Sequence, residues 1–190
     1  ESLEGKRGIP RNRPPRLAER GYLGLPTVVN NVETYCAAAL ILHHGADWFR
    51  GFGTAKSSGT KLISVAGDCE RPGVYEYPFG VTIREVLADC GARRTIAVQC
   101  GGPSGQCLDQ DEFHRRISFE DLESGGAFIV FDEGRDMFEV ARHFSHFFAA
   151  ESCGFCTPCR VGTSLLARIM DRVSEGKGSE HDLQAMQELQ

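Results

Sequence analysis

Three cysteines at three-residue intervals are the part of this sequence best suited to chemistry. Cys153, Cys156 and Cys159 lie in the segment Glu-Ser-Cys-Gly-Phe-Cys-Thr-Pro-Cys-Arg-Val-Gly, residues 151–162. Two residues between consecutive cysteines let one turn of backbone direct three thiolates toward a common point, and glycine and proline between them favour a loop. The spacing therefore predicts an iron–sulfur cubane, held by these three thiolates and by a fourth ligand from elsewhere.

Two other kinds of site remain open on the residues alone. A Cys-x-x-Cys pair is typical of redox dithiols, although a third cysteine three residues later leaves an odd thiol. Zinc bound by three cysteines and one histidine is the second alternative, with His143 or His146 as the histidine. Zinc ligands usually come as two pairs rather than one triplet, which favours the cubane.

The segment 151–162 resembles the cluster signature of the NADH-oxidising flavoprotein subunit of respiratory complex I. The same signature belongs to the diaphorase subunits of NAD-linked hydrogenases and formate dehydrogenases. The resemblance covers the chain from Ser2 to its end. The runs Glu-Tyr-Pro-Phe-Gly (76–80) and Gly-Gly-Pro-Ser-Gly (101–105) look most like the diaphorase subunit of NAD-reducing hydrogenase.

This resemblance implies a set of ligands and cofactors. In the family the three cysteines bind a [4Fe–4S] cluster, with a fourth cysteine roughly forty residues further along the chain. That position would fall just past Gln190, so we expect this sequence to be a fragment of a larger subunit. The implied reaction is hydride exchange between NAD(H) and FMN, followed by single-electron transfer between the flavin and the cluster. The family's glycine-rich flavin loop is absent, so this fragment alone is not expected to oxidise NADH.

Flavin contacts and partners also follow only from the resemblance. The run Val-Asn-Asn-Val-Glu-Thr (29–34) is similar to the family segment whose asparagines contact FMN, which implies Asn30, Asn31 and Thr34 as flavin contacts. On the residues alone, Asn30 and Asn31 are typical of a turn and a helix cap. The implied partners are the other subunits of a multi-subunit oxidoreductase, including a small thioredoxin-like [2Fe–2S] subunit.

Composition narrows the function classes. The 190 residues are 41% hydrophobic and 25% charged, as in ordinary globular proteins, with a net charge of −5 that argues against general nucleic-acid affinity. No apolar run is long enough to insert into a membrane, and we expect a cytoplasmic protein. The eight cysteines do not form a regular disulfide framework, so those outside the motif are expected to be reduced thiols. Cys100 and Cys107 match no common ligand pattern and are expected to be packing thiols.

The order of elements predicts an α+β fold with several parts. Residues 1–56 are expected to end a flavin domain, beginning with a basic, proline-rich arm (1–26) and including a helix that starts after Asn31. Residues 57–112 predict a small β-grasp domain of the SLBB type, with a hairpin, a helix capped by Thr82 and Glu85, and a strand at 95–99. We expect the strand in 113–133 to return to the flavin domain, and residues 134–190 to form a truncated helical bundle around the cluster, whose second helix opens near Gly162 and Thr163. A ligand-binding β-grasp module without a redox role is a further interpretation.

Overall fold

The computed structural model describes residue 5 and residues 15–189. The chain divides into two compact units, which are described separately. We call Val29–Arg135 the sheet unit, and Asp136–Gln190 together with Glu1–Val28 the helical unit. Half of the basic arm predicted at 1–26 lies outside the described residues, and its later part contains a short 3-10 turn at Tyr22–Gly24.

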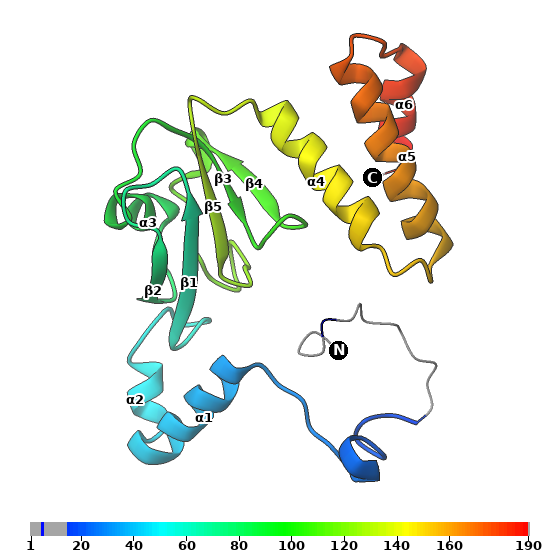
Figure 1. The fold of residues 1–190 in the computed structure, drawn as a ribbon. Helices are drawn as coiled ribbons and strands as arrows, with labels where there is room; N and C mark the ends of the chain where they lie inside the picture. The colour runs from blue at the N-terminus through cyan, green and yellow to red at the C-terminus, as the bar shows by residue number, and fades with distance from the viewer. Residues whose placement is uncertain (1–4, 6–14, 190) are drawn as a thin grey trace. The chain divides into compact units, whose positions relative to one another are not determined.

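The sheet unit is built on five strands in the order β2-β1-β5-β3-β4 (Figure 1). The strands are β1 (Thr60–Gly67), β2 (Gly73–Pro78), β3 (Thr95–Cys100), β4 (Gln106–Asp109) and β5 (Ala127–Asp132). β1 and β2 pair antiparallel, which confirms the predicted hairpin. β5 runs parallel to β1 and antiparallel to β3.

The position of β5 corrects one expectation. The strand predicted to leave for the flavin domain instead occupies the centre of this sheet, between β1 and β3. The apolar run of β5 accounts for this, because Phe128 and Phe131 point to opposite faces of the strand and are only 2% and 8% exposed, as in a strand covered on both faces. β4 was also missed, since it is only four residues long and two of its members are polar.

The helix α3 (Ile83–Asp89) closes the core of the sheet unit. Its capping box matches the prediction, because Thr82 Oγ1 accepts from Glu85 N–H at 3.2 Å and Glu85 Oε2 accepts from Thr82 N–H at 2.8 Å. The Glu85 carboxylate accepts from the Thr82 N–H and also from the Thr82 hydroxyl, and these two bonds, the first having the larger effect, hold the pKa of Glu85 below its usual range. The buried face of α3 packs on apolar residues of the sheet and its loops, including Ile63, Val98, Leu108, Ile117, Leu122 and Phe128.

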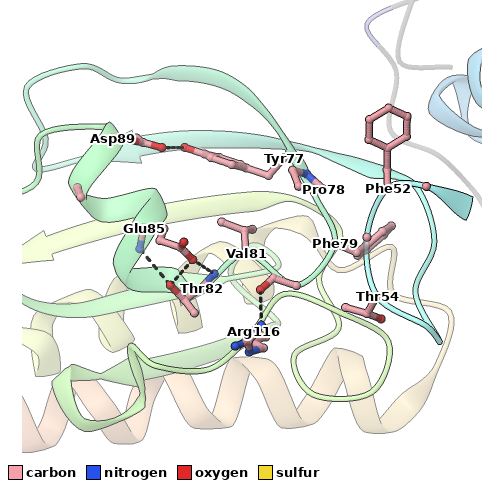
Figure 2. Close-up of a pocket in the computed structure, with 14 residues that line it drawn as sticks. Phe52, Thr54, Tyr77, Pro78, Phe79, Val81, Thr82, Glu85, Asp89 and Arg116 are labelled. Atoms are coloured by element: carbon pink, nitrogen blue, oxygen red, sulfur yellow. Dashed lines mark hydrogen bonds between the residues drawn. The ribbon is translucent and has the colours of Figure 1, made fainter. Parts of the chain in front are cut away.

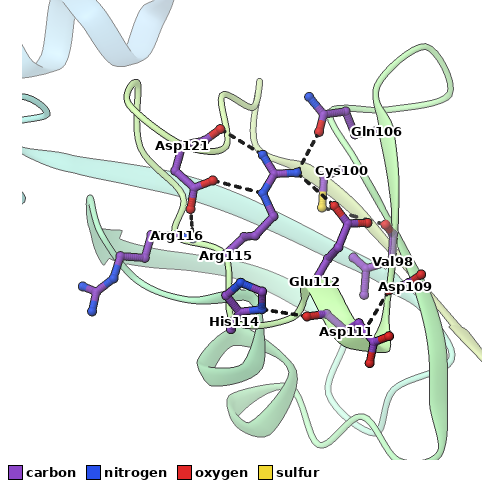
Figure 3. Close-up of polar contacts among 10 residues, drawn as sticks. All are labelled: Val98, Cys100, Gln106, Asp109, Asp111, Glu112, His114, Arg115, Arg116 and Asp121. Atoms are coloured by element: carbon purple, nitrogen blue, oxygen red, sulfur yellow. Dashed lines mark hydrogen bonds and ion pairs between the residues drawn. The ribbon is translucent and has the colours of Figure 1, made fainter.

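Arg115 organises the connection between β4 and β5 (Figure 3). Its guanidinium donates to Asp121 Oδ1 at 3.0 Å and to the Asp121 carbonyl at 3.0 Å. The same group donates to Gln106 and Glu112, each at 3.2 Å. The partly buried Arg115 guanidinium therefore holds the connection between β4 and β5 in place. A short 3-10 turn at Gln110–Glu112 lies next to it.

Two helices precede the sheet. α1 (Val32–His44) and α2 (Ala46–Arg50) belong to the sheet unit, and α1 has no buried residue. Glu33 joins α1 to β1, because its carboxylate accepts from Lys61 Nζ at 2.5 Å and from Leu62 N–H at 2.8 Å. Burial alone would raise the pKa of Glu33, but these two bonds outweigh it and hold the pKa below its ordinary value.

The helical unit contains α4 (Met137–Glu151), α5 (Thr157–Ser174) and α6 (Glu180–Glu188). This agrees with the predicted run of three helices, and Ser179 caps α6 in a capping box with Asp182. α4 packs on α5, where Arg142 donates to Glu139 at 2.7 Å and to Asp171 at 2.9 Å. None of the helices in the described part of the chain has both the length and the apolarity that a membrane crossing requires.

Candidate metal centre

The three motif cysteines lie where α4 connects to α5. Cys153 is in the connection, Cys156 is the N-cap residue of α5, and Cys159 lies in its first turn. The helix therefore begins earlier than the predicted opening near Gly162. Pro158 explains the difference, because proline suits the first turn of a helix, where its missing N–H leaves no intrahelical bond unmade.

The loop is tied down by its own polar groups. Ser152 Oγ lies 3.4 Å from Cys159 Sγ and also accepts from Gly154 N–H at 3.3 Å. The Arg160 guanidinium donates to the Gly154 carbonyl across the loop, and to Thr157 Oγ1 at 3.3 Å. A guanidinium and a helix N-terminus both favour negative charge on nearby sulfur, since each supplies positive potential.

The donor set fits an iron–sulfur cluster in its chemistry. All three thiols are free and exposed, and the first turn of α5 contains no acidic residue that would oppose thiolates. Among residues 5 and 15–189, however, no three histidine, cysteine or carboxylate side chains converge on one point as metal ligands do. The structure therefore places the three predicted ligands between the end of α4 and the first turn of α5 without assembling them into a finished coordination site.

The histidines considered for zinc have other surroundings. His146 Nε2 lies 2.8 Å from Asp171 Oδ1, in the same cluster as Arg142. The hydrogen bond from His146, followed by the one from Arg142, keeps the pKa of Asp171 below its usual range. His146 thus serves the contact between α4 and α5, and neither it nor His143 joins a three-ligand group in the described chain.

The residues implied as flavin contacts lie at the start of α1. Asn31 is the N-cap residue of α1, the position that its residue type favours. Its side chain, however, makes no capping hydrogen bond. Asn30, Asn31 and Thr34 are all exposed. The structure brings these three residues together at one helix end and leaves their role as flavin contacts a prediction.

A cavity of ≈ 910 Å³ lies in the sheet unit between the 51–54 loop, the end of β2 and α3 (Figure 2). Its acidic groups are already paired, Glu85 with Thr82 and Asp89 with Tyr77, whose hydroxyl donates to Asp89 Oδ2 at 2.9 Å. Arg116 donates weakly to the Gly80 carbonyl at 3.5 Å. The cavity wall therefore offers no converging set of unpaired polar groups that would select a ligand.

Cys100 is a packing thiol as predicted, whereas Cys107 is exposed, so the expectation of a packing thiol is wrong for that residue. Cys100 is 2% exposed in the core, and burial raises its pKa to about 12. Burial also raises the pKa of Cys107, which is near Glu112 and Asp109. A thiol that resists ionisation is a poor metal ligand, because the ligand form is the thiolate.

The helices around the cysteines match a known protein family. Residues 139–190 match the model described as the NADH-ubiquinone oxidoreductase-F iron–sulfur binding region. Residues 139–190 belong to that family. This iron–sulfur binding region contains all three cysteines of the motif.

Relatives extend the match along the whole chain. The chain is 51% identical to the NAD-reducing hydrogenase HoxS subunit alpha of Cupriavidus necator over 187 residues, 98% of this chain and 31% of that protein. It is 43% identical to the NADP-reducing hydrogenase subunit HndC of Solidesulfovibrio fructosivorans, over 99% of this chain and 41% of that protein. A subunit of the NADH-quinone oxidoreductase of Escherichia coli is 37% identical over 99% of this chain and 45% of its own length. The chain thus spans about a third to a half of these homologues.

A solved structure confirms the fold. The chain superposes with a TM-score of 0.89 and 47% identity on a chain of the NAD⁺-reducing [NiFe]-hydrogenase in the H₂-reduced state, over 99% of this chain and 34% of that chain. The air-oxidised state of such an enzyme gives a TM-score of 0.86. The mixed α/β architecture of one five-stranded sheet and accompanying helices is therefore shared with that hydrogenase chain.

Two residues at these sites escaped sequence reasoning. Ser152 contacts Cys159, and its place beside Cys153 in the motif was a signal that could have singled it out. Glu33 pins α1 to β1 through Lys61, a contact across the loop between α2 and β1 that carries no local sequence signal.

Proposed function

We propose that this chain is the electron-transferring segment of an NAD(H)-linked flavoprotein oxidoreductase subunit, in which electrons pass between FMN and a [4Fe–4S] cluster. The observation that carries the proposal is the cysteine triplet at the start of α5, inside a matched iron–sulfur binding region. Hydrogenase and NADH-quinone oxidoreductase subunits align along nearly the entire chain. A cytoplasmic location and partner subunits, including a small thioredoxin-like [2Fe–2S] subunit, are part of this proposal.

In this function Cys153, Cys156 and Cys159 would hold the cluster, which accepts and releases one electron at a time. The chain's own groups have supporting roles. Ser152 can donate to Cys159 once the sulfur is a thiolate, because a thiolate has no proton to give. Arg160 braces the loop through Gly154 and adds a fixed positive charge. Both features favour the reduced, more negative state and so raise the reduction potential.

The sheet unit contributes the flavin side of the proposal. We place Asn30, Asn31 and Thr34 beside FMN, with NAD(H) bound by parts of the subunit beyond this segment. The exposed state of all three side chains supports this, as does α1, an apolar helix without a buried residue. A helix of this kind is typical of an element that packs on further protein surface.

The test is metal analysis of the full-length protein under anaerobic conditions. Cys156→Ser is expected to lose about four irons and their sulfide per chain relative to the wild type, together with a reducible cubane EPR signal. Cys107→Ser is the matched control, because it removes an exposed thiol outside the motif and should retain the iron. Stoichiometric zinc in place of iron at this site would contradict the proposal and support a zinc-stabilised interaction module.

A further inference from the structure

A second pair of thiols lies in the sheet unit, far in sequence from the motif. Cys69 follows the end of β1 by two residues, and Cys90 is the C-cap residue of α3. Cys90 is 0% exposed, and Cys69 packs partly buried against the same core. Burial, and to a smaller extent the nearby Cys69 thiol, raise the pKa of Cys90. Two thiols from separate segments therefore lie at the same part of the core.

The backbone brings these segments together independently of the thiols. Cys69 forms an antiparallel bridge with Ala92. Two residues on, Arg71 N–H donates to the Cys90 carbonyl at 2.9 Å. These backbone contacts bring Cys69 and Cys90 close together where the turn after β1 meets the end of α3.

The approach between the two segments is close. Gly91 has φ +69°, and a Cβ added there would lie 3.0 Å from Cβ of Glu70. The Arg71 guanidinium donates to the Asp89 carbonyl at 2.6 and 3.1 Å. Contacts on both sides of the thiol pair therefore hold the turn after β1 against the end of α3.

We propose that Cys69 and Cys90 form a reversible disulfide when the protein meets a hydroperoxide, stapling the end of α3 to the turn after β1. The Cys69 thiolate attacks a peroxide oxygen, and the O–O bond breaks to give a sulfenic acid and, with hydrogen peroxide, water. The Cys90 sulfur then attacks the sulfenic sulfur, the S–S bond forms and a second water leaves. Two thiols lose two electrons and two protons in total, and the peroxide is reduced to two waters.

The exposure of the two residues sets the order of these steps. Cys69 is the thiol that a small oxidant reaches, because Cys90 is fully covered. The Cys90 S–H donates to the Leu87 carbonyl at 3.3 Å, and burial raises the pKa of Cys90. The closing step is therefore the slow one near neutral pH, and its rate rises with pH as more Cys90 thiolate forms.

Formation of the disulfide should stabilise the sheet unit without adding packing contacts. The disulfide encloses β2 and the whole of α3 in one covalent loop, which restricts the unfolded chain. The staple also lies beside the cavity of Figure 2, whose wall includes Asp89 and Tyr77. Oxidation is expected to raise the thermal midpoint of the sheet unit by about 10 °C.

The test is peptide mapping of the reduced full-length protein after exposure to hydrogen peroxide, followed by alkylation and digestion without a reductant. We expect a cross-linked peptide joining Cys69 and Cys90, a raised thermal midpoint, and reversal of both by dithiothreitol. Cys69→Ser should abolish the cross-link and leave Cys90 open to alkylation after denaturation. Cys107→Ser, the control that removes another exposed thiol, should behave as the wild type.

Two outcomes would overturn the proposal. One is Cys69 oxidised to its sulfinic acid while Cys90 remains a free thiol; the other is a disulfide from Cys69 to a different cysteine. Should Cys69→Ser fail to fold, Cys69→Ala provides the same deletion, and the wild-type peptide map still decides between the two cysteine pairings.

Discussion

In the sheet unit, Ile63 and Phe128 are 0% and 2% exposed within one continuous core. In the described part of the helical unit, the buried apolar residues are Ala167, Ile169 and Met170, all on α5. The helical unit relies more on polar contacts between helices, such as Arg142 with Asp171. The sheet unit is therefore stabilised mainly by apolar burial. The helical unit has an exposed cysteine loop, and binding of a cluster would order that loop.

The largest expected effect comes from core truncation in the two units. Phe128→Ala should lower the free energy of unfolding of the sheet unit by about 3–5 kcal/mol, because a fully buried ring in the central strand leaves a cavity. Met170→Ala should cost the helical unit about 2 kcal/mol, at the low end for such a deletion, since its surroundings are sparser.

Hydrogen exchange measured by mass spectrometry separates the two truncations. Faster exchange in β1 and β5 alone is expected for Phe128→Ala, and in α4 and α5 alone for Met170→Ala. If either variant accelerates exchange equally in both units, they fold as one cooperative body and the comparison fails.

Removing a helix cap should have a smaller effect on stability, and the same kind of cap occurs in both units. Thr82→Ala and Ser179→Ala each remove a side chain that accepts from the third helical N–H, at 3.2 and 3.3 Å. Each should cost about 1 kcal/mol. We expect the Thr82 loss to lower the denaturation midpoint of the sheet unit, because α3 closes its core. The Ser179 loss should appear only as faster exchange in α6; a shift in the midpoint of the whole helical unit would show that α6 is integral to it.

The smallest expected effect is a change in how the thermal midpoint depends on pH. Two bonds from Arg135 and one from the Asp132 N–H hold the pKa of Asp68 below its ordinary value near 3.9. A lowered folded-state pKa adds stability above the unfolded-state pKa, and this stability is lost as the pH falls through the folded-state pKa. Asp68→Asn should therefore have a lower thermal midpoint than the wild type at pH 7, and the difference should shrink below about pH 4.

The control for this measurement is Asp47→Asn. Asp47 is 98% exposed and pairs only locally with Arg50, so its loss should leave the pH dependence unchanged. A constant difference between Asp68→Asn and the wild type from pH 3 to 7 would be inconsistent with an ionised Asp68 that stabilises the fold.

Local patterns in the sequence were enough for several elements. The Thr82 and Glu85 capping box predicted α3, and the β-rich runs predicted the hairpin of β1 and β2. These elements follow from contacts between near neighbours in the chain, which a pattern records directly. The start of α5 was predicted too late, because the cysteine loop was extended past Pro158, a residue that favours the first turn of a helix.

The sequence by itself determined the chemical inventory: three thiols at fixed spacing, the residues around them, and the periodicity of most helices and strands. Only the tertiary structure decided where distant segments meet. It put β5 at the centre of the sheet, set Glu33 against Lys61, and brought the Cys69 segment beside the Cys90 segment. The physical reason is that spacing along the chain limits only what nearby residues can do together. Pairings across long loops depend on which buried surfaces fit one another.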